Sequence, residues 1–436
     1  MREAKGMVIT MKKYILPERS IYETAHYDVI IAGSGPAGVC AALSAARSGL
    51  KVLLIEKMGC IGGHWTSGML CLVLDKLGKG GILKEITSKL SDIHAINILN
   101  AQEEIFSYDV EAMKVILEEM CMTENIDILL HTRVTEAIYQ GRMIQAVVTE
   151  NNSGTQVFSA EVFIDCTGNG DLGAYAGCSF DSGHPFSGKQ QPATLEAIVS
   201  GVPPEMNFCL DERTKIKLRE LMESVGIQPS YKMPTLFKLP KGNLWCFHVN
   251  HQYGTRHDSA WEITKATVEA RKEIFDMVKA LRRLPSWEKL TLVCTAESIG
   301  IREGRRIHGL YSIGREDIAC GTRFEDGICT VRFAVDIHSL DATYGGGYEN
   351  ADIHVKPYHI PYRSLVAAEM NNLGMAGRCI SGDFYAHASY RVTANCAAMG
   401  EALGYAAGLA IKYGIGLHQV DGKEISEYMI KAGYDI

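Results

Sequence analysis

Three glycines and an acid stand at the spacing of a nucleotide-binding turn. Gly33, Gly35 and Gly38 form G-x-G-x-x-G, and Glu56 follows Gly35 by 21 residues. In such a turn the first glycine permits a tight bend, the second lets a diphosphate approach the backbone, and the third lets a helix pack close to a strand. A carboxylate at the position of Glu56 accepts hydrogen bonds from both hydroxyls of an adenosine ribose. The pattern predicts a ligand that contains ADP.

The residues around this turn predict the elements that would position it. Residues 28–32 (DVIIA) are a short apolar run typical of a strand buried on both faces of a parallel sheet. Four apolar residues then recur at helical spacing: Val39, Ala42, Leu43 and Ala46. Gly49 ends that helix, and residues 51–57 (KVLLIEK) supply the next strand. Glycines alone also occur in ordinary turns, so the prediction depends on the complete order of strand, helix, strand and acid.

Three later segments bear on whether the ligand is NAD or FAD. Residues 57–69 (KMGCIGGHWTSGM) contain a Gly-Gly pair, residues 163–178 (FIDCTGNGDLGAYAGC) run from a strand into a Thr-Gly turn, and residues 372–410 join a strand, a Gly-Asp turn and a helix of small residues. In that helix Gly400, Gly404 and Gly408 recur every four residues, which predicts close packing on one face. Each segment taken singly is also compatible with an ordinary strand-end turn. Their joint order favours FAD, because an enzyme that binds only NAD needs none of them.

These segments resemble the FAD-dependent oxidoreductases of the glutathione-reductase-type flavoprotein superfamily. The stretches GGHWTSG and GIREGRRIHGLY are similar to a bacterial branch that also resembles the flavoprotein subunit of heterodisulfide reductases and, distantly, fumarate reductases. The resemblance covers about half of the chain, in residues 25–77, 108–178, 297–311 and 358–410.

The resemblance implies an α/β fold. A Rossmann-like FAD-binding domain with a parallel sheet and a β-meander would comprise residues 26–180 and 358–436. A mixed α+β cap or substrate domain, residues 181–357, would be inserted into it, and residues 1–25 would form an N-terminal extension.

It also implies how FAD is held. The three glycines would bind the diphosphate, Glu56 the ribose, and a helix beginning near Thr393 would direct its N-terminus at the flavin O2 edge, where reduction builds negative charge. The full set of expected cofactor residues is Gly33, Gly35, Pro36, Ala37, Gly38, Arg47, Glu56, Lys57, Gly62, Gly63, His64, Trp65, Val134, Thr167, Gly168, Gly382, Asp383, Thr393 and Asn395.

The sequence departs from related families at its cysteines. Disulfide reductases of this superfamily carry a C-x4-C pair after the first flavin loop, and here only Cys71 lies nearby. None of the 13 cysteines forms a C-x-x-C, which argues against a zinc knot or an iron–sulfur cluster and favours free thiols in the cytoplasm. No second nucleotide-binding unit for NAD(P)H is expected, so the electron acceptor is unidentified.

Composition limits the partners further. The 436 residues have a formal charge of -7 without long basic runs, so nucleic acid is not an expected partner. No apolar run reaches the roughly 18 residues of a membrane-spanning helix, so no membrane partner is expected either. A small-molecule substrate and an electron acceptor are the expected partners, and a homo-oligomer stays open.

Candidate substrate residues lie in three places. Arg302, Arg305 and Arg306 would make a fork for carboxylate or hydroxyl groups, with Arg302 the first choice, or else salt bridges that fix the cap. His387 and Arg391 precede the helix expected to face the flavin, and His387 is the first choice of general base, against a structural role. Further candidates are Asp336, His338, Tyr344, Tyr358, His359 and Arg363. The spacing of His248, His251 and His257 is only a weak hint of metal, and no metal site is predicted.

The leading hypothesis is an FAD-dependent dehydrogenase or oxidase. It would transfer hydride from a small polar substrate, such as a hydroxy acid or sugar derivative, to flavin N5. Two alternatives stay open: a flavoprotein electron-transfer subunit that works with an iron–sulfur partner, and an NAD-binding dehydrogenase without flavin.

Overall fold

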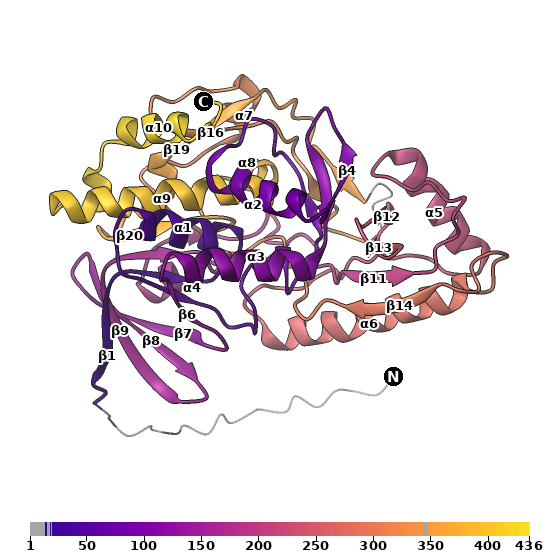
Figure 1. The fold of residues 1–436 in the computed structure, drawn as a ribbon, viewed down its shortest axis with the longest axis horizontal. Coiled ribbons are helices and arrows are strands. Elements are labelled where there is room, and N and C mark those ends of the chain that lie inside the picture. The colour runs from indigo at the N-terminus through magenta and orange to yellow at the C-terminus, as the bar shows by residue number, and fades with distance from the viewer. Residues whose placement is uncertain (1–13, 15–17, 19, 343–346) are drawn as a thin grey trace.

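The computed structural model describes residues 14, 18, 20–342 and 347–436 (Figure 1). Most of the expected N-terminal extension lies outside the described residues, as does Tyr344. The first strand, β1, spans Glu23–Ala32 and therefore begins five residues before the predicted apolar run, inside the range expected for the extension.

A central sheet carries the nucleotide-binding turn. Its order is β6-β2-β1-β9-β8-β7, and β1 pairs in parallel with both β2 and β9. The strands β9, β8 and β7 are antiparallel neighbours, so the predicted combination of parallel sheet and β-meander is confirmed. The other strands of this sheet are β2 (Val52–Ile55), β6 (Asp127–Leu129), β7 (Arg133–Gln140), β8 (Met143–Asn151), β9 (Gly154–Asp165) and β20 (Leu373–Met375), which pairs in parallel with the end of β9.

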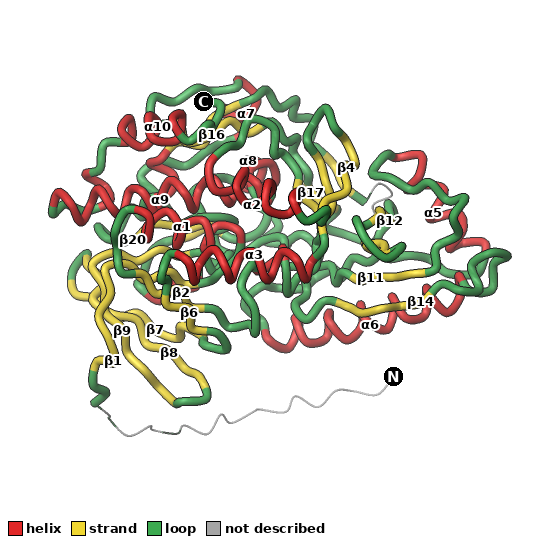
Figure 2. Tube along the Cα trace, viewed as in Figure 1, coloured by secondary structure: helices red, strands yellow, loops and turns green. Residues whose placement is uncertain are grey.

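Two helices pack closely against this sheet and each other. They are α1 (Pro36–Arg47), which follows the turn directly, and α9 (Thr393–Tyr413), the predicted helix of small residues. In Figure 2 they lie together beside the sheet. The remaining helices of this part are α2 (Gly81–Asp92), α3 (Val110–Thr123), α4 (Asp171–Tyr175), α7 (Arg315–Cys320), α8 (Phe384–Tyr390) and α10 (Gly422–Lys431), with 3-10 turns at Gly63–Trp65, Tyr362–Leu365 and Leu417–Gln419.

Within the described residues, short strands form four further small sheets. They form the ribbons β3 (Leu72–Val73) with β5 (Ile105–Tyr108) and β4 (Ile96–Asn100), β10 (Phe180–Asp181) with β15 (Arg306–Ile307), β16 (Gly327–Val331) with β19 (Tyr358–Pro361), and β17 (Ile337–His338) with β18 (Tyr348–Glu349).

A second, antiparallel sheet forms the cap at the other end of the molecule (Figure 1). Its order is β12-β13-β11-β14, and α5 and α6 pack against it. The elements are β11 (Ala197–Ser200), β12 (Thr235–Lys238), β13 (Leu244–His248), β14 (Thr291–Thr295), α5 (Glu212–Ser224) and α6 (Ala260–Leu281). The mixed α+β cap is thus present.

The buried hydrophobic side chains fall into two main cores. Most of those between Ala193 and Ile299 form the smaller core, but Ile198, Phe237, Leu239 and Cys246 pack into the larger core with the central sheet. Ile307, Val331 and Ile353 also belong to the larger core. The boundary expected at residues 181–357 stays a prediction. On the packing, we propose residues 193–301 as the unit that folds around the cap sheet.

Candidate active site

A cavity of about 670 Å³ lies between the nucleotide-binding turn and the cap sheet. Gly33, Gly35 and Glu56 line one end, and Glu196, Tyr231 and His248 line the other. The volume falls within the range of small-molecule and cofactor sites, roughly 300–1,000 Å³. One continuous space therefore joins the two parts of the chain.

The three glycines of the turn differ in what surrounds them. Gly33 has φ +92°, and a Cβ added there would lie 2.5 Å from the Cys166 carbonyl oxygen. A Cβ on Gly38 would lie 1.9 Å from the Gly33 carbonyl oxygen. A Cβ on Gly35 would meet nothing within 4 Å, because its backbone faces the cavity. Gly33 and Gly38 thus shape the turn, and Gly35 leaves room for a ligand.

The start of α1 offers an anion site at this end. Gly35 is its N-cap residue and supplies no side-chain hydrogen bond to the first turn. Free N–H groups and the helix dipole at such an end attract phosphate. Beyond the end of β2, the Glu56 carboxylate accepts hydrogen bonds from the Ser34 N–H (2.9 Å) and the Met58 N–H (3.0 Å), which fixes it at the cavity wall.

Arg378 lines the cavity and was not predicted from the sequence. Its guanidinium lies against Gly168, whose φ is +72°, and donates to the Asn169 side chain at 3.2 Å. Burial lowers the pKa of Arg378, and its Nε has no partner among the described residues. The only sequence signal for it is a charged residue directly after the strand β20 and Gly377.

The start of α9 is a second helix N-terminus at the cavity. Arg391, Val392 and Thr393 line the cavity, and Val392 provides no side-chain cap. Asn395, one turn in, is fully buried, and neither polar atom of its side chain has a partner among the described residues. This end of the cavity is therefore also suited to negative charge.

Histidine and carboxylate side chains form a chain of contacts at the cap end. The Nδ1 of His338 lies 2.9 Å from the Nε2 of His251, and its Nε2 lies 3.1 Å from the Oδ2 of Asp336. The pKa of His338 is lowered to about 3, mainly by burial and next by the positive charge of Arg302. Burial alone would raise the pKa of Asp336, but His338, Arg391 and Arg302 together hold it below its ordinary value. At neutral pH the carboxylate is charged and the imidazole is neutral.

A second pair of imidazole and carboxylate side chains lies beside these contacts. Ala197 of β11 is in register with Phe247 of β13, so Glu196 and His248 are neighbours at the ends of the two central strands of the cap sheet. The His248 Nδ1 lies 2.6 Å from the Glu196 Oε1. The Tyr231 ring stacks on His251 with centroids 4.0 Å apart and meets His248 edge-on at 5.3 Å. Tyr231 thereby joins both histidine groups in one cluster.

The structure places most of the predicted cofactor residues on the cavity wall, although their roles stay predictions. Those on the wall are Gly33, Gly35, Pro36, Ala37, Glu56, Lys57, Gly63, His64, Val134, Thr167, Gly168 and Thr393, together with the predicted substrate residues Arg302 and Arg391. Those absent from the wall are Gly38, Arg47, Gly62, Trp65, Gly382, Asp383, Asn395 and His387.

Three of these absences have a clear physical reason. Arg47 was expected beside a phosphate, but its guanidinium bonds Glu85 and Glu124 at 2.8 Å, away from the cavity. Asp383 caps α8 by accepting from the Ala386 N–H at 2.7 Å, so the Gly382–Asp383 turn orients a helix.

His387 does not line the cavity that it was expected to serve. The side chain is fully buried, and neither ring nitrogen has a hydrogen-bond partner among the described residues. Burial, followed by Arg306, lowers its pKa well below the ordinary value. His248 and His338 line the cavity, whereas His387 does not.

The three histidines weighed as metal ligands have separate partners. His248 pairs with Glu196, His251 with His338, and the Nδ1 of His257 lies 2.7 Å from the Gln190 side chain.

Arg305 of the predicted fork pairs with Asp171 at 3.0 Å, and Arg306 donates to the Gly382 carbonyl. Of the fork, only Arg302 lines the cavity.

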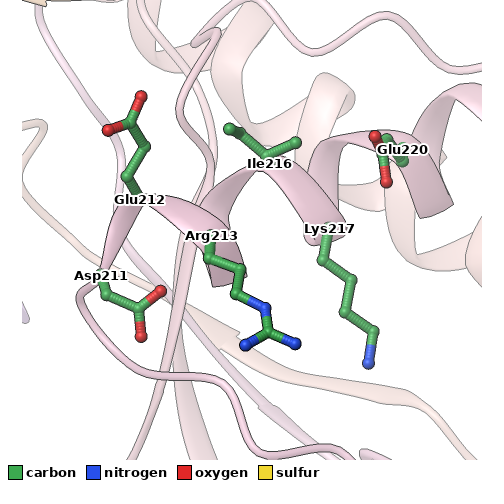
Figure 3. A pocket seen from close by; sticks show the side chains of 6 residues that line it. All are labelled: Asp211, Glu212, Arg213, Ile216, Lys217 and Glu220. Atoms are coloured by element: carbon green, nitrogen blue, oxygen red, sulfur yellow. The ribbon is translucent and has the colours of Figure 1, made fainter.

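A separate surface hollow of about 830 Å³ lies over the first turns of α5 (Figure 3). It is lined by Asp211, Glu212, Arg213, Ile216, Lys217 and Glu220. These side chains come from one short stretch, are mostly exposed, and include no histidine or cysteine. The groups able to do chemistry gather instead in the buried cavity, which Lys215 of the same helix also lines.

Comparison with known proteins identifies the family. The profile of the family described as FAD dependent oxidoreductase matches residues 28–429. The chain belongs to this family. FAD is therefore its cofactor, and the cavity suits FAD: a glycine cradle at an uncapped helix N-terminus, with Glu56 on the same wall.

Individual relatives match shorter stretches of this oxidoreductase. A soluble pyridine nucleotide transhydrogenase of Vibrio vulnificus is 24% identical over 160 residues, 33% of this chain and 31% of that protein. The tRNA uridine 5-carboxymethylaminomethyl modification enzyme MnmG of Bacillus licheniformis is 27% identical over 250 residues, 50% of this chain and 36% of that protein. The chain thus spans about a third of the length of these two relatives.

A solved structure was also found to be similar. It is a geranylgeranyl bacteriochlorophyll reductase-like protein from Thermoplasma acidophilum, with a TM-score of 0.49 and 15% identity over 94% of this chain and 84% of the other. Within the described part of the oxidoreductase, no helix has the length and apolarity needed to cross a membrane.

Proposed function

We propose that this FAD-dependent oxidoreductase is a dehydrogenase or oxidase that oxidises a small polar organic molecule bound at the cap end of the cavity. One observation carries the proposal: a single cavity runs from the glycine turn and Glu56 to a cluster of arginine, histidine and carboxylate side chains. Such a cluster is what an enzyme needs to orient a polar substrate and manage one proton.

The residues of the chain would divide the work by position. The start of α1 and Gly35 hold the diphosphate, and Glu56 accepts from the ribose. Bound FAD supplies the acceptor for hydride. Arg302 and Arg391 bind and orient the substrate, and the cap sheet closes the cavity against water. A cavity-lining histidine that keeps a ring nitrogen free for the substrate takes the hydroxyl proton.

Anaerobic flavin bleaching tests this proposal. The purified holoenzyme is mixed without oxygen with a panel of hydroxy acids (glycolate, lactate, malate) and sugars, and the flavin absorbance is followed. We expect at least one compound to bleach the flavin within seconds to minutes. Bleaching by dithionite but by no member of a broad panel would contradict the proposal. Stable co-purification with an iron–sulfur protein in that case would support the electron-transfer alternative and the relation to heterodisulfide reductase subunits.

A further inference from the structure

The two arginines at the cap end lack a full complement of negative partners. Arg302 donates through Nη1 to two neutral acceptors, the Pro192 carbonyl at 2.6 Å and the Thr194 hydroxyl at 2.8 Å. Its Nε and Nη2 make no hydrogen bond to another described residue. The pKa of Arg302 is lowered to about 10, mainly by burial and next by the positive charge of Arg391, so Arg302 stays charged at neutral pH.

Arg391 and His338 contact the same carboxylate, that of Asp336. Its Nη2 donates to the Asp336 carbonyl at 2.7 Å and lies 3.4 Å from the Asp336 Oδ2, which also lies 3.1 Å from His338. The Arg391 Nε has no partner among the described residues.

Other carboxylates nearby are already engaged. Glu303 accepts from both the backbone N–H and the side-chain amide of Gln191, and Glu196 lies 2.6 Å from His248. Among the described residues, Asp336 is therefore the one carboxylate in ion-pair contact with Arg302 or Arg391. Glu303 and Glu196 act on Arg391 and Arg302 only over longer distances, so no carboxylate of the described residues lies within ion-pair distance of Arg302.

Buried guanidinium donors without an acceptor are costly, and a ligand carboxylate would satisfy those of Arg302 and Arg391 through two-point hydrogen bonding. A neutral sugar would fill the same space but would leave Arg302 without an acidic partner in direct contact. The unused donors therefore favour an acid over a sugar.

His248 is placed to act on the other end of such a ligand. Its Nδ1–H is held by Glu196, which leaves the Nε2 lone pair on the cavity side. No hydrogen bond from this Nε2 to a described residue competes for it.

We infer that the substrate is a hydroxy acid whose carboxylate binds Arg302 and Arg391 and whose hydroxyl proton passes to the Nε2 of His248. The O–H bond breaks to protonate His248, the carbinol C–H bond breaks with its electron pair going to FAD, and a C=O bond forms. The substrate loses two electrons to become an oxo acid, and FAD gains them. This oxidation step rests on the proposed function, whereas the carboxylate site does not.

Oxalate binding tests the carboxylate site without turnover, because oxalate has no C–H bond to lose. Binding to the oxidised holoenzyme is measured by calorimetry and by the change in flavin absorbance. We expect Arg302→Met and Arg391→Met each to weaken oxalate binding by roughly 10- to 100-fold, the loss of hydrogen bonds to a charged group. Arg302→Lys, which keeps the charge but not the fork, should fall between them and the wild type.

The matched control is Arg363→Met, an arginine that pairs with Asp326 outside the cavity. It should leave oxalate binding unchanged. FAD content and melting temperature of each variant identify any that fail to fold. Oxalate affinity that is insensitive to Arg302 and Arg391 in folded variants, or glycerol binding as tight as oxalate, would overturn the inference.

His248→Asn tests the proton acceptor. With whichever of glycolate, lactate or malate reduces the wild type, flavin reduction should slow by at least about 100-fold while oxalate affinity stays within about threefold. An unchanged rate would remove His248 from the role.

The outcomes separate this inference from the proposed function. Arginine-dependent oxalate binding without flavin reduction by any compound supports the carboxylate site and contradicts the oxidation. Flavin reduction by a sugar without oxalate binding supports the oxidation and contradicts the carboxylate site.

Discussion

The carbonyl oxygen of Ala37 lies directly against Gly400, and a Cβ added at Gly400 would be 2.0 Å from it. A Cβ added at Gly404 would be 2.4 Å from the Ala41 carbonyl oxygen, and one added at Gly408 would be 2.8 Å from the Ser48 side chain. The predicted close packing of this glycine repeat is thus confirmed, and its partner is α1, the helix that starts at the nucleotide-binding turn.

Alanine substitutions along this repeat should be graded in effect. Gly400→Ala forces the backbone of α1 to move, so we expect a loss of about 2 kcal/mol or more in unfolding free energy and weaker FAD retention. Gly408→Ala overlaps less, with the Ser48 Cβ at 2.8 Å, and should cost about 1 kcal/mol. Urea unfolding and flavin content measure both effects. Equal losses at the two positions would contradict the packing described.

The turn glycines should separate cofactor binding from folding. Gly35→Ala meets no protein atom within 4 Å, so the protein should fold as well as the wild type and bind FAD at least about tenfold more weakly. Gly38→Ala meets the Gly33 carbonyl and should lower the unfolding free energy of the FAD-free protein by about 1–3 kcal/mol. FAD titration and melting of the FAD-free protein distinguish the two. Tight FAD binding by Gly35→Ala would argue against a diphosphate at this turn.

Arg47 should prove to be structural. Because its guanidinium is half-exposed and pairs with Glu85 and Glu124, Arg47→Met should cost no more than about 1 kcal/mol in stability. FAD affinity should stay within about twofold of the wild type. A marked loss of FAD would restore the phosphate-binding role expected from the sequence.

Stability should fall in mild acid. Burial lowers the pKa of His338 to about 3, so between pH 6.5 and 3 the unfolded chain binds a proton that the folded one refuses, and stability decreases as pH falls. At pH 5 this one group costs about 2 kcal/mol. His338→Asn should therefore show a shallower loss of unfolding free energy from pH 7 to pH 5.

The exposed His354 provides the control for that measurement. His354→Asn should keep the wild-type dependence on pH. If His338→Asn kept it as well, His338 would not be a buried neutral imidazole.

The nucleotide end of the cavity could be predicted from the sequence because its parts are local. Gly33, Gly35 and Glu56 lie within one strand–helix–strand unit, so their spacing alone places them together. The cap end has no such signal. Glu196, His248 and Asp336 come from distant segments that meet only through the register of the cap sheet and the packing of β17.

The sequence also could not show which of the expected residues would fail to line the cavity. His387 and Gly382 stand near the correct element in sequence, but side-chain direction decides which neighbour faces the cavity. One turn of helix separates His387, buried in the larger core region, from Arg391, on the cavity wall. Sequence spacing does not resolve that difference.

The two hydrophobic cores meet at the cavity. Strands β11 and β13, which end beside Glu196 and His248, contribute Val199 and Phe247 to the smaller core, whereas Val335 and Ile337, which flank Asp336, belong to the larger core. On the proposed function, substitutions in the smaller core would alter the substrate end of the cavity through β11 and β13 and leave the nucleotide-binding turn unchanged.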